Sequence, residues 1–184
     1  MSAEYPGARW APSPNFTPGR DEAVDTIVAH HTDGQPRTDR AVEHLQKSRA
    51  DYQAEGRDRS PVSAHFLIGQ DGEIVQLVRL QDTAWHCSGW NGRSIGIEHI
   101  ARTPGELGPE DPGLPLTPAQ LDASAALVAW LRRRHALPMS AVKPHCANPK
   151  TTHRDCGRDV LDGGIWPWAE YLRRIELLDP AGAP

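Results

Sequence analysis

The sequence has no long hydrophobic run and no excess of positive charge. No segment of the 184-residue chain approaches the run of roughly 20 apolar residues that a transmembrane helix needs. Residues 1–16 also lack the basic start and apolar stretch of a signal peptide. The formal net charge is −4 with both signs mixed along the chain, so no basic footprint for nucleic acid or membrane is present. These absences predict a soluble, cytoplasmic product that binds neither nucleic acid nor membrane.

Cysteine is scarce as well, with Cys87, Cys146 and Cys156 the three in the chain. An odd number cannot form a complete disulfide framework. The simplest allocation is one metal ligand and two spare thiols, while a Cys87–Cys146 pair stays open for an oxidising compartment. The chain length suits one well-cored domain rather than two, and we expect a monomer.

Apolar periodicity and turn residues predict a mixed α/β domain, with a central mixed sheet flanked by helices. The clearest helix start is Thr117-Pro118-Ala119-Gln120, which has an N-cap, a first-turn proline and a capping-box glutamine. Strands are expected over 24–32, 62–68, 73–78, 94–100 and 141–142, the second and third joined as a hairpin at GQDG, and helices over 38–52, 117–136 and 168–178. The domain should span residues 23–178, between an irregular segment over 1–22 and a tail over 179–184.

His30 and His31 end the first predicted strand. A buried strand holds its last side chain still where the chain opens to solvent, which is where a metal ligand is needed. Successive strand side chains point to opposite faces, so only one of the two histidines can enter a given site. A second cluster, from His145 to Cys156, lies in a loop rich in proline, threonine and asparagine. A catalytic zinc takes three protein ligands and an open position for water, and His30 with two residues of this loop would supply them. A strand-end histidine that is merely hydrogen-bonded is the structural alternative.

Four segments, taken in order, carry a family resemblance. They are IVAHHT, VSAHFLIGQDGEIVQLV, AWHCSGWNGRSIGIE and the loop from His145 to Cys156. Together they resemble the zinc-dependent N-acetylmuramoyl-L-alanine amidases of the type 2 family, which includes the peptidoglycan recognition proteins and amidase-type phage lysozymes. The resemblance runs from about Val24 to Leu172. It implies a fold like that of the peptidoglycan recognition proteins, one zinc ion per chain, and hydrolysis of the amide between N-acetylmuramic acid and L-alanine in peptidoglycan or muropeptides.

The same resemblance assigns the metal ligands one by one. His30 matches the family's first zinc ligand, His145 the second and Cys156 the third. The interval between the last two is longer than the family usually leaves, so His153 and Asp155 stay as alternatives. A thiolate is the better zinc ligand, which favours Cys156.

Glu98, in SIGIE, matches the catalytic acid of the branch that includes cytoplasmic recycling amidases. A carboxylate beside the attacking water can take its proton and pass it to the leaving amine. A strand glutamate that faces solvent is the structural alternative. Another branch of the family uses a tyrosine where this chain has Ala64. Arg154 lies where the family carries Lys or Thr to stabilise the developing oxyanion, with Lys150 and Thr152 as alternatives.

Substrate contacts are expected from the hairpin and the loop that follows it. His86, in AWHCSG, matches a position that lines the family's substrate groove, and Trp85 precedes it. Asn91 and Arg93 are candidates for holding the peptide stem, and His65 is a further candidate from the hairpin strand.

Other functions remain open beside the amidase. A non-catalytic peptidoglycan-binding module is the main alternative, which the presence of both Cys156 and Glu98 disfavours. A zinc hydrolase of another amide, or a structural zinc domain with a fourth ligand, is a further one. A phage endolysin, a recycling enzyme and a toxin would share this core, and an endolysin would act on the cell wall after release from the cytoplasm.

Overall fold

A mixed sheet with helices on both faces forms the fold, which our computed structural model describes over residues 2–34, 36–150 and 166–180. The strands are β1 (Arg9–Trp10), β2 (Phe16–Thr17), β3 (Thr26–His31), β4 (Phe66–Ile68), β5 (Ile74–Gln76), β6 (Thr83–Ala84), β7 (Ser94–His99) and β8 (Val142–Pro144). The helices are α1 (Thr38–Gln46), α2 (Arg49–Ala54), α3 (Pro118–His135) and α5 (Trp168–Leu178), with 3-10 turns η1 (Asn91–Arg93), η2 (Met139–Ala141) and η3 (His145–Ala147). Within the described residues, no helix is both long and apolar enough to cross a membrane.

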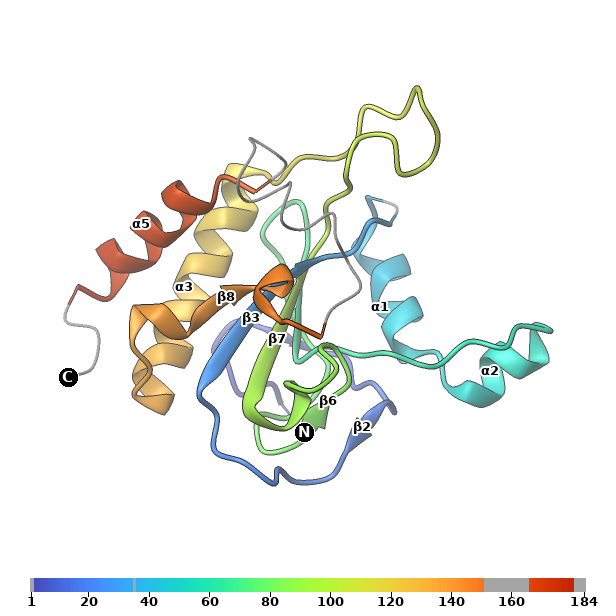
Figure 1. The fold of residues 1–184 in the computed structure, drawn as a ribbon, viewed down its shortest axis with the longest axis horizontal. Coiled ribbons are helices and arrows are strands. Elements are labelled where there is room, and N and C mark those ends of the chain that lie inside the picture. The colour runs from blue at the N-terminus through green and yellow to red at the C-terminus, as the bar shows by residue number, and fades with distance from the viewer. Residues whose placement is uncertain (1, 35, 151–165, 181–184) are drawn as a thin grey trace.

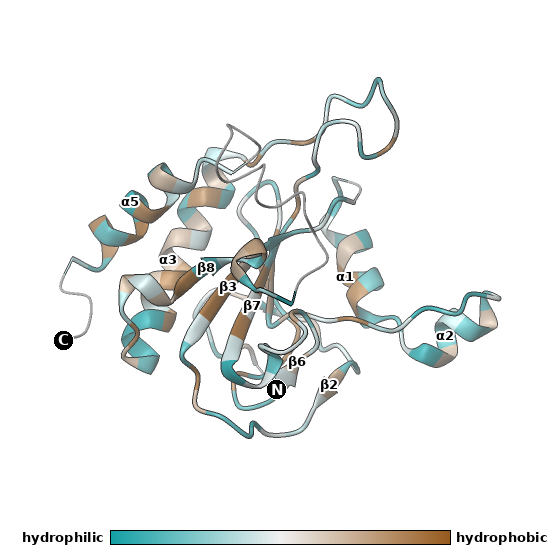
Figure 2. Ribbon diagram, in the orientation of Figure 1, coloured by the Kyte–Doolittle hydropathy of each residue, from teal (hydrophilic) through white to brown (hydrophobic). Residues whose placement is uncertain are grey.

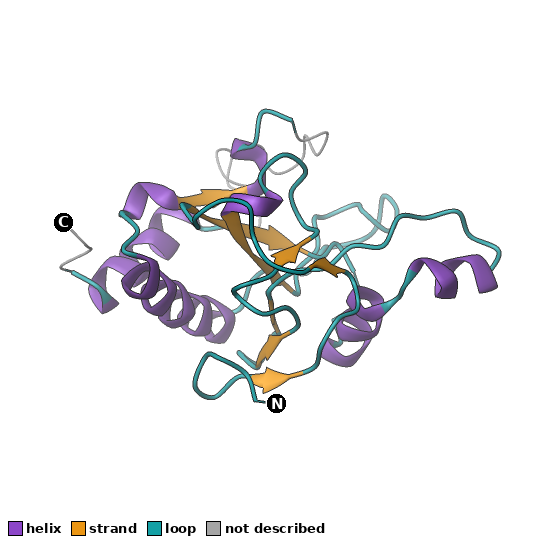
Figure 3. Cartoon of the chain, turned by 90° about the horizontal axis from the view of Figure 1, so that it is seen from below, coloured by secondary structure: helices purple, strands orange, loops and turns teal. Residues whose placement is uncertain are grey.

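The six-stranded sheet has the order β1-β5-β4-β7-β3-β8, and β2 and β6 form a separate pair. Strand β3 lies between β7 and β8, parallel to both, while β4 and β5 form the predicted antiparallel hairpin. Figure 1 shows α3 and α5 together on one side of the sheet and α1 on the other. The turned view of Figure 3 shows α2 standing apart from the sheet beyond α1. The predicted fold class, a central mixed sheet flanked by helices, is therefore confirmed.

Alternating side chains of the strands supply two separate cores. Phe66 and Ile68 pack in the cluster that includes α3 and α5, whereas Leu67 between them packs with Val42 and Leu45 of α1. Both faces of the central strands are thus buried, which is typical of parallel strands covered by helices. Figure 2 shows the resulting hydrophobic residues along β3 and β7.

Most predicted elements are found in the structure, and the two predictions that were wrong both concern the N-terminal half of the chain. The capping box of Thr117 and Gln120 starts α3, and α5 has the predicted bounds. The helix predicted over 38–52 is instead two helices, because Ser48 caps a new one and forms a capping box with Asp51. The segment over 1–22, predicted to be irregular, contains β1 and β2, and β1 extends the edge of the sheet beside β5.

A buried chain of hydrogen bonds joins the sheet to α3 and α5. His99, fully buried at the end of β7, donates from Nδ1 to the carbonyl oxygen of His30 at 2.8 Å. Its Nε2 lies 2.7 Å from the Ser124 hydroxyl, which in turn lies 2.7 Å from the Tyr171 hydroxyl. A carbonyl can only accept, so the ring hydrogen of neutral His99 is on Nδ1 and Nε2 accepts from Ser124. Burial lowers the pKa of His99 to about 4.

Acid should therefore destabilise the fold through His99. Above about pH 6.5 the residue is neutral in both the folded and unfolded chain, but below it the unfolded chain binds a proton that folded His99 does not. The free energy of unfolding then falls until the pH reaches about 4, by up to about 3 kcal/mol for this residue. Urea denaturation with a chelator present, at several pH values between these limits, should show a smaller loss for His99→Gln than for the wild type. Equal losses in the two proteins would contradict this account.

Candidate active site

A cavity of about 640 Å³ opens where β3 and β7 end. His30 enters it from β3, Glu98 from β7, His86 from the loop before η1, and His145 from η3. His31 also borders the cavity, but its ring nitrogens contact Thr103 and Trp166. The carboxyl ends of neighbouring parallel strands lie at one edge of a sheet, where open α/β sheets place their ligands. Residues more than a hundred positions apart in the sequence meet there for this reason.

Three imidazole rings converge in the cavity. The ring centroid of His30 lies 4.5 Å from that of His145 and 5.1 Å from that of His86. His30 Nε2 is 3.0 Å from His86 Nδ1. Burial, with the neighbouring rings contributing, lowers the pKa of His30 well below its usual value and that of His86 to about 3. A neutral imidazole keeps a lone pair, so the lowered pKa of His30 suits a zinc ligand, and His145 places a second imidazole beside it.

Glu98 faces the same cavity. It pairs with His30 across the parallel register of β3 and β7, so the two side chains lie on the same face of the sheet. Its Oε2 is buried and has no hydrogen-bond partner among the described residues. Burial raises the pKa of Glu98 to about 7. The sequence left open whether Glu98 faces solvent or the site. In the structure Glu98 points to the cavity, whereas His99 points to the α3 side of the sheet.

The predicted substrate-contacting residues separate into two groups. Trp85 and His86 line the cavity, and Trp85 Nε1 donates to Thr17 Oγ1 at 3.0 Å. His65, Asn91 and Arg93 are absent from the described lining. Instead, these three residues form hydrogen bonds with protein groups near the cavity.

Each of the three has protein partners that account for its position. His65 is fully buried, with Nε2 2.6 Å from Arg20 Nη2 and Nδ1 accepting from the Gly96 amide at 3.0 Å. Asn91 Oδ1 accepts from the backbone amides of His86 and Cys87, at 3.0 and 2.6 Å. Arg93 forms a bidentate ion pair with Asp25 on the surface.

Several predicted residues lie outside the described part of the chain. They are Thr152, His153, Arg154, Asp155 and Cys156. Over residues 2–34, 36–150 and 166–180 no group of three histidine, cysteine or carboxylate side chains is arranged to hold a metal ion. The assignment of His30, His145 and Cys156 as zinc ligands therefore stays a prediction.

The structure also bears on the open question of a Cys87–Cys146 disulfide. Cys87 is a buried free thiol that accepts a hydrogen bond from Asn148 Nδ2 at 3.0 Å, so the two cysteines are not paired. The same hydrogen bond ties the loop of His86 to the segment that follows His145.

Sequence reasoning missed Gly96 and Ser94, which lie against His86. A Cβ on Gly96 would be 2.4 Å from His86 Cγ, and Ser94 Oγ is 3.1 Å from His86 Nε2. A glycine inside a strand is a sign of close approach by another group, so SIGIE did carry the signal. The serine carried none, because its partner comes from the preceding loop.

The basic part of the lining, Arg40, His44 and Arg59, was missed as well. Arg40 and His44 lie on α1, and Arg59 on the segment before β4. In the sequence they look like ordinary surface charges.

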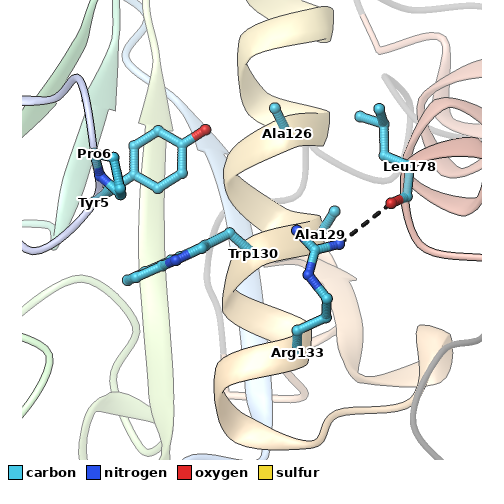
Figure 4. A pocket seen from close by; sticks show the side chains of 7 residues that line it. All are labelled: Tyr5, Pro6, Ala126, Ala129, Trp130, Arg133 and Leu178. Carbon is cyan, nitrogen blue, oxygen red and sulfur yellow. Dashed lines mark hydrogen bonds between the residues drawn. The ribbon is translucent and has the colours of Figure 1, made fainter.

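A second cavity, of about 290 Å³, lies between the N-terminal segment and the α3–α5 pair (Figure 4). The rings of Tyr5 and Trp130 meet there edge to face, 5.3 Å apart, and Arg133 donates to the carbonyl oxygen of Leu178 at 3.2 Å. None of the described residues that line it is a histidine or a carboxylate. The catalytic candidates are therefore those of the larger cavity.

Comparison with known proteins agrees with this arrangement. The family model described as N-acetylmuramoyl-L-alanine amidase matches residues 20–158. The chain belongs to this family. The matched range contains the residues predicted as zinc ligands and Glu98.

Two curated relatives of this amidase family match part of the chain. The 1,6-anhydro-N-acetylmuramyl-L-alanine amidase AmpD of Escherichia coli (strain K12) is 36% identical over 107 residues, 50% of this chain and 58% of that protein. The N-acetylmuramoyl-L-alanine amidase A of Achromobacter lyticus is 52% identical over 42 residues, 22% of this chain and 24% of that protein. Each match spans less than two thirds of the relative's length.

The amidase fold is shared over nearly the whole chain. A crystal structure of a selenomethionine derivative of AmpD superposes with a TM-score of 0.69 at 27% sequence identity, covering 97% of this chain and 98% of that one. The likeness includes both the sheet and the helices, in agreement with the predicted fold.

In this member of the amidase family, Gly96→Ala tests whether the His86 ring is fixed against the β7 backbone. The added methyl would meet the ring at 2.4 Å, so we expect the His86 side chain to move and the site to lose zinc affinity and activity. Gly96 does not have a positive φ, so alanine should leave the strand backbone intact. Zinc titration and circular dichroism of the variant would measure both effects. Wild-type zinc affinity in a folded variant would show that His86 is not held as we describe.

Proposed function

We propose that the protein hydrolyses the amide between N-acetylmuramic acid and L-alanine in peptidoglycan or muropeptides, using one zinc ion. The observation that carries the proposal is the meeting of His30, His145 and Glu98 in one cavity, with Glu98 Oε2 buried and without a hydrogen-bond partner among the described residues. Family membership and the names of the relatives support the bond that is cut.

The residues present fit a zinc ion. Two imidazole rings approach each other at the cavity, and Oε2 of Glu98 is a buried polar atom without a described partner. His30 and His145 would hold the metal, with Cys156 as the predicted third ligand. When bound, zinc polarises the scissile carbonyl and acidifies water.

Glu98 then serves as the base and the acid. Its carboxylate accepts a proton from the attacking water and delivers that proton to the amine nitrogen of L-alanine as the amide C–N bond breaks. The products are the lactyl carboxyl group of the muramic acid and a peptide with a free amino terminus. Arg154 is the residue we propose for stabilising the oxyanion.

The basic part of the cavity supports a peptidic, acidic substrate. Arg40 and His44 border the cavity from α1, and Arg59 borders it from the segment before β4. Carboxylates of a peptide stem would pair with the guanidinium groups of Arg40 and Arg59 once the muramic acid amide lies at the site. Burial and the nearby Arg59 lower the pKa of His44, so its neutral ring would contribute a hydrogen bond rather than a charge. Trp85 offers an apolar ring in the same lining.

Mass spectrometry of a defined muramyl peptide incubated with the protein tests the proposal. We expect release of a peptide that begins with free L-alanine, its loss with a zinc chelator and its return when zinc is added. No release, with zinc bound and the peptide retained on the protein, would show a binding module instead. Intact peptidoglycan and a soluble muropeptide, tested side by side, distinguish a lytic enzyme from a recycling enzyme.

A further inference from the structure

The hydrogen of His86 can be located from its partners. The Ser94 hydroxyl lies 2.7 Å from the carbonyl oxygen of Trp90, and that oxygen can only accept. Ser94 therefore donates its one hydroxyl hydrogen to the carbonyl oxygen of Trp90. His86 Nε2, 3.1 Å from Ser94 Oγ, must then be the donor to the serine oxygen. In a neutral imidazole this leaves Nδ1 of His86 without a hydrogen.

The same reasoning continues to His30. His86 Nδ1 is 3.0 Å from His30 Nε2, and two nitrogen lone pairs do not face each other at this distance. His30 therefore carries its hydrogen on Nε2 and donates it to His86. Its Nδ1 is left with the lone pair that a metal ion requires.

We propose that His86 is a positioning residue that fixes the tautomer of the ligand His30, through a relay formed by the Trp90 carbonyl, Ser94, His86 and His30. A metal-bound histidine usually donates its other N–H to a protein acceptor, which sets the ring orientation and raises the ligand's basicity. Here that acceptor is itself an imidazole. The inference rests on the metal site of the proposed function.

Two further contacts show that the acceptor is built in place. The backbone amide of His86 is held by Asn91, and Gly96 leaves the space in which the ring lies. Both ring nitrogens have protein partners, so neither is available to a substrate in this arrangement. His86 lines the cavity, while its Nδ1 accepts from His30 and its Nε2 donates to Ser94.

Two substitutions separate the acceptor from the rest of the ring. In His86→Asn the amide oxygen can occupy the place of Nδ1 and still accept from His30. In His86→Gln the terminal amide reaches the place of Nε2 instead, which keeps the contact with Ser94 and loses the acceptor. The two variants are similar in polarity, so they form a matched pair.

Zinc affinity, measured by competition with a chromophoric chelator, is the readout, and it does not depend on turnover. We expect His86→Gln to bind zinc about 10- to 100-fold more weakly than the wild type. His86→Asn should lose less than about tenfold. The visible spectrum of the cobalt-substituted protein should change in His86→Gln and be largely restored in His86→Asn. Thermal melting of the metal-free variants checks that both are folded.

Two results would overturn the relay. Equal zinc affinities for the two variants would show that the acceptor at Nδ1 does not matter. Wild-type zinc affinity in His86→Gln together with a raised KM would show that His86 contacts the substrate. A wild-type protein that binds zinc but releases no peptide would instead contradict the proposed function and leave the relay standing.

Discussion

Glu98→Gln is expected to lower kcat by about 10²- to 10⁴-fold, the usual contribution of a general acid–base group. Glutamine has nearly the same size but cannot take a proton from water at this position. The Glu98 carboxylate lies opposite His30 in the sheet register, and its buried Oε2 has no partner among the residues that the structure describes. The change therefore removes the proton acceptor while leaving the proposed ligands in place. Zinc content per chain, measured by elemental analysis, should equal that of the wild type. The rate of peptide release gives kcat.

Glu106→Gln is the matched control for this variant. Glu106 also lines the cavity, but it lies in the exposed loop between β7 and α3. The substitution removes one negative charge from the same cavity without touching the carboxylate beside His30, and we expect kcat to stay near the wild-type value. A comparable loss in both variants would show that the charge of the cavity, and not proton transfer by Glu98, limits turnover. Loss of zinc from Glu98→Gln would make Glu98 a ligand.

His145→Ala is expected to remove bound zinc and abolish activity. The ring of His145 lies 4.5 Å from that of His30, and its loss would leave two predicted protein ligands in place of three. Zinc stoichiometry after gel filtration and the peptide-release assay measure the two effects. His135→Ala is the control, because His135 lies in the last turn of α3 and outside the cavity lining, and this variant should keep both zinc and activity.

The third ligand can be identified with the same assay. Cys156→Ala should behave like His145→Ala, whereas His153→Ala and Asp155→Ala should retain zinc. Zinc retained in Cys156→Ala and lost in either of the other two would move the third ligand to that residue.

The elements that the sequence predicted well are those whose signals are local. The cap at Thr117 and the alternation in the β4–β5 hairpin depend on neighbours a few residues away. The capping box at Ser48 was also local, but the apolar spacing of the predicted helix continued past it and favoured one helix over two.

Long-range pairing is what the sequence could not supply. The direction of Glu98 depends on which residue of β3 it faces, and that register is a backbone pairing between strands more than sixty residues apart in the sequence. Arg93 looked available for substrate because its partner, Asp25, is distant in sequence. The role of Ser94 depends on the placement of His86 by Asn91 and Gly96. Each case needs the chain folded before the contact exists.

The pairing of β3 with β7 has a consequence for how such a protein can change. Neighbouring strands in a sheet are held about 4.8 Å apart by their backbone hydrogen bonds, whatever their side chains. The spacing between the residue proposed to move the proton and the first proposed ligand is therefore fixed by the backbone. The basic residues of the lining and the loop that contains Glu106 belong to other segments of the chain than β3 and β7. Loops exchanged between relatives could thus alter the choice of substrate while the distance that the chemistry depends on is inherited unchanged.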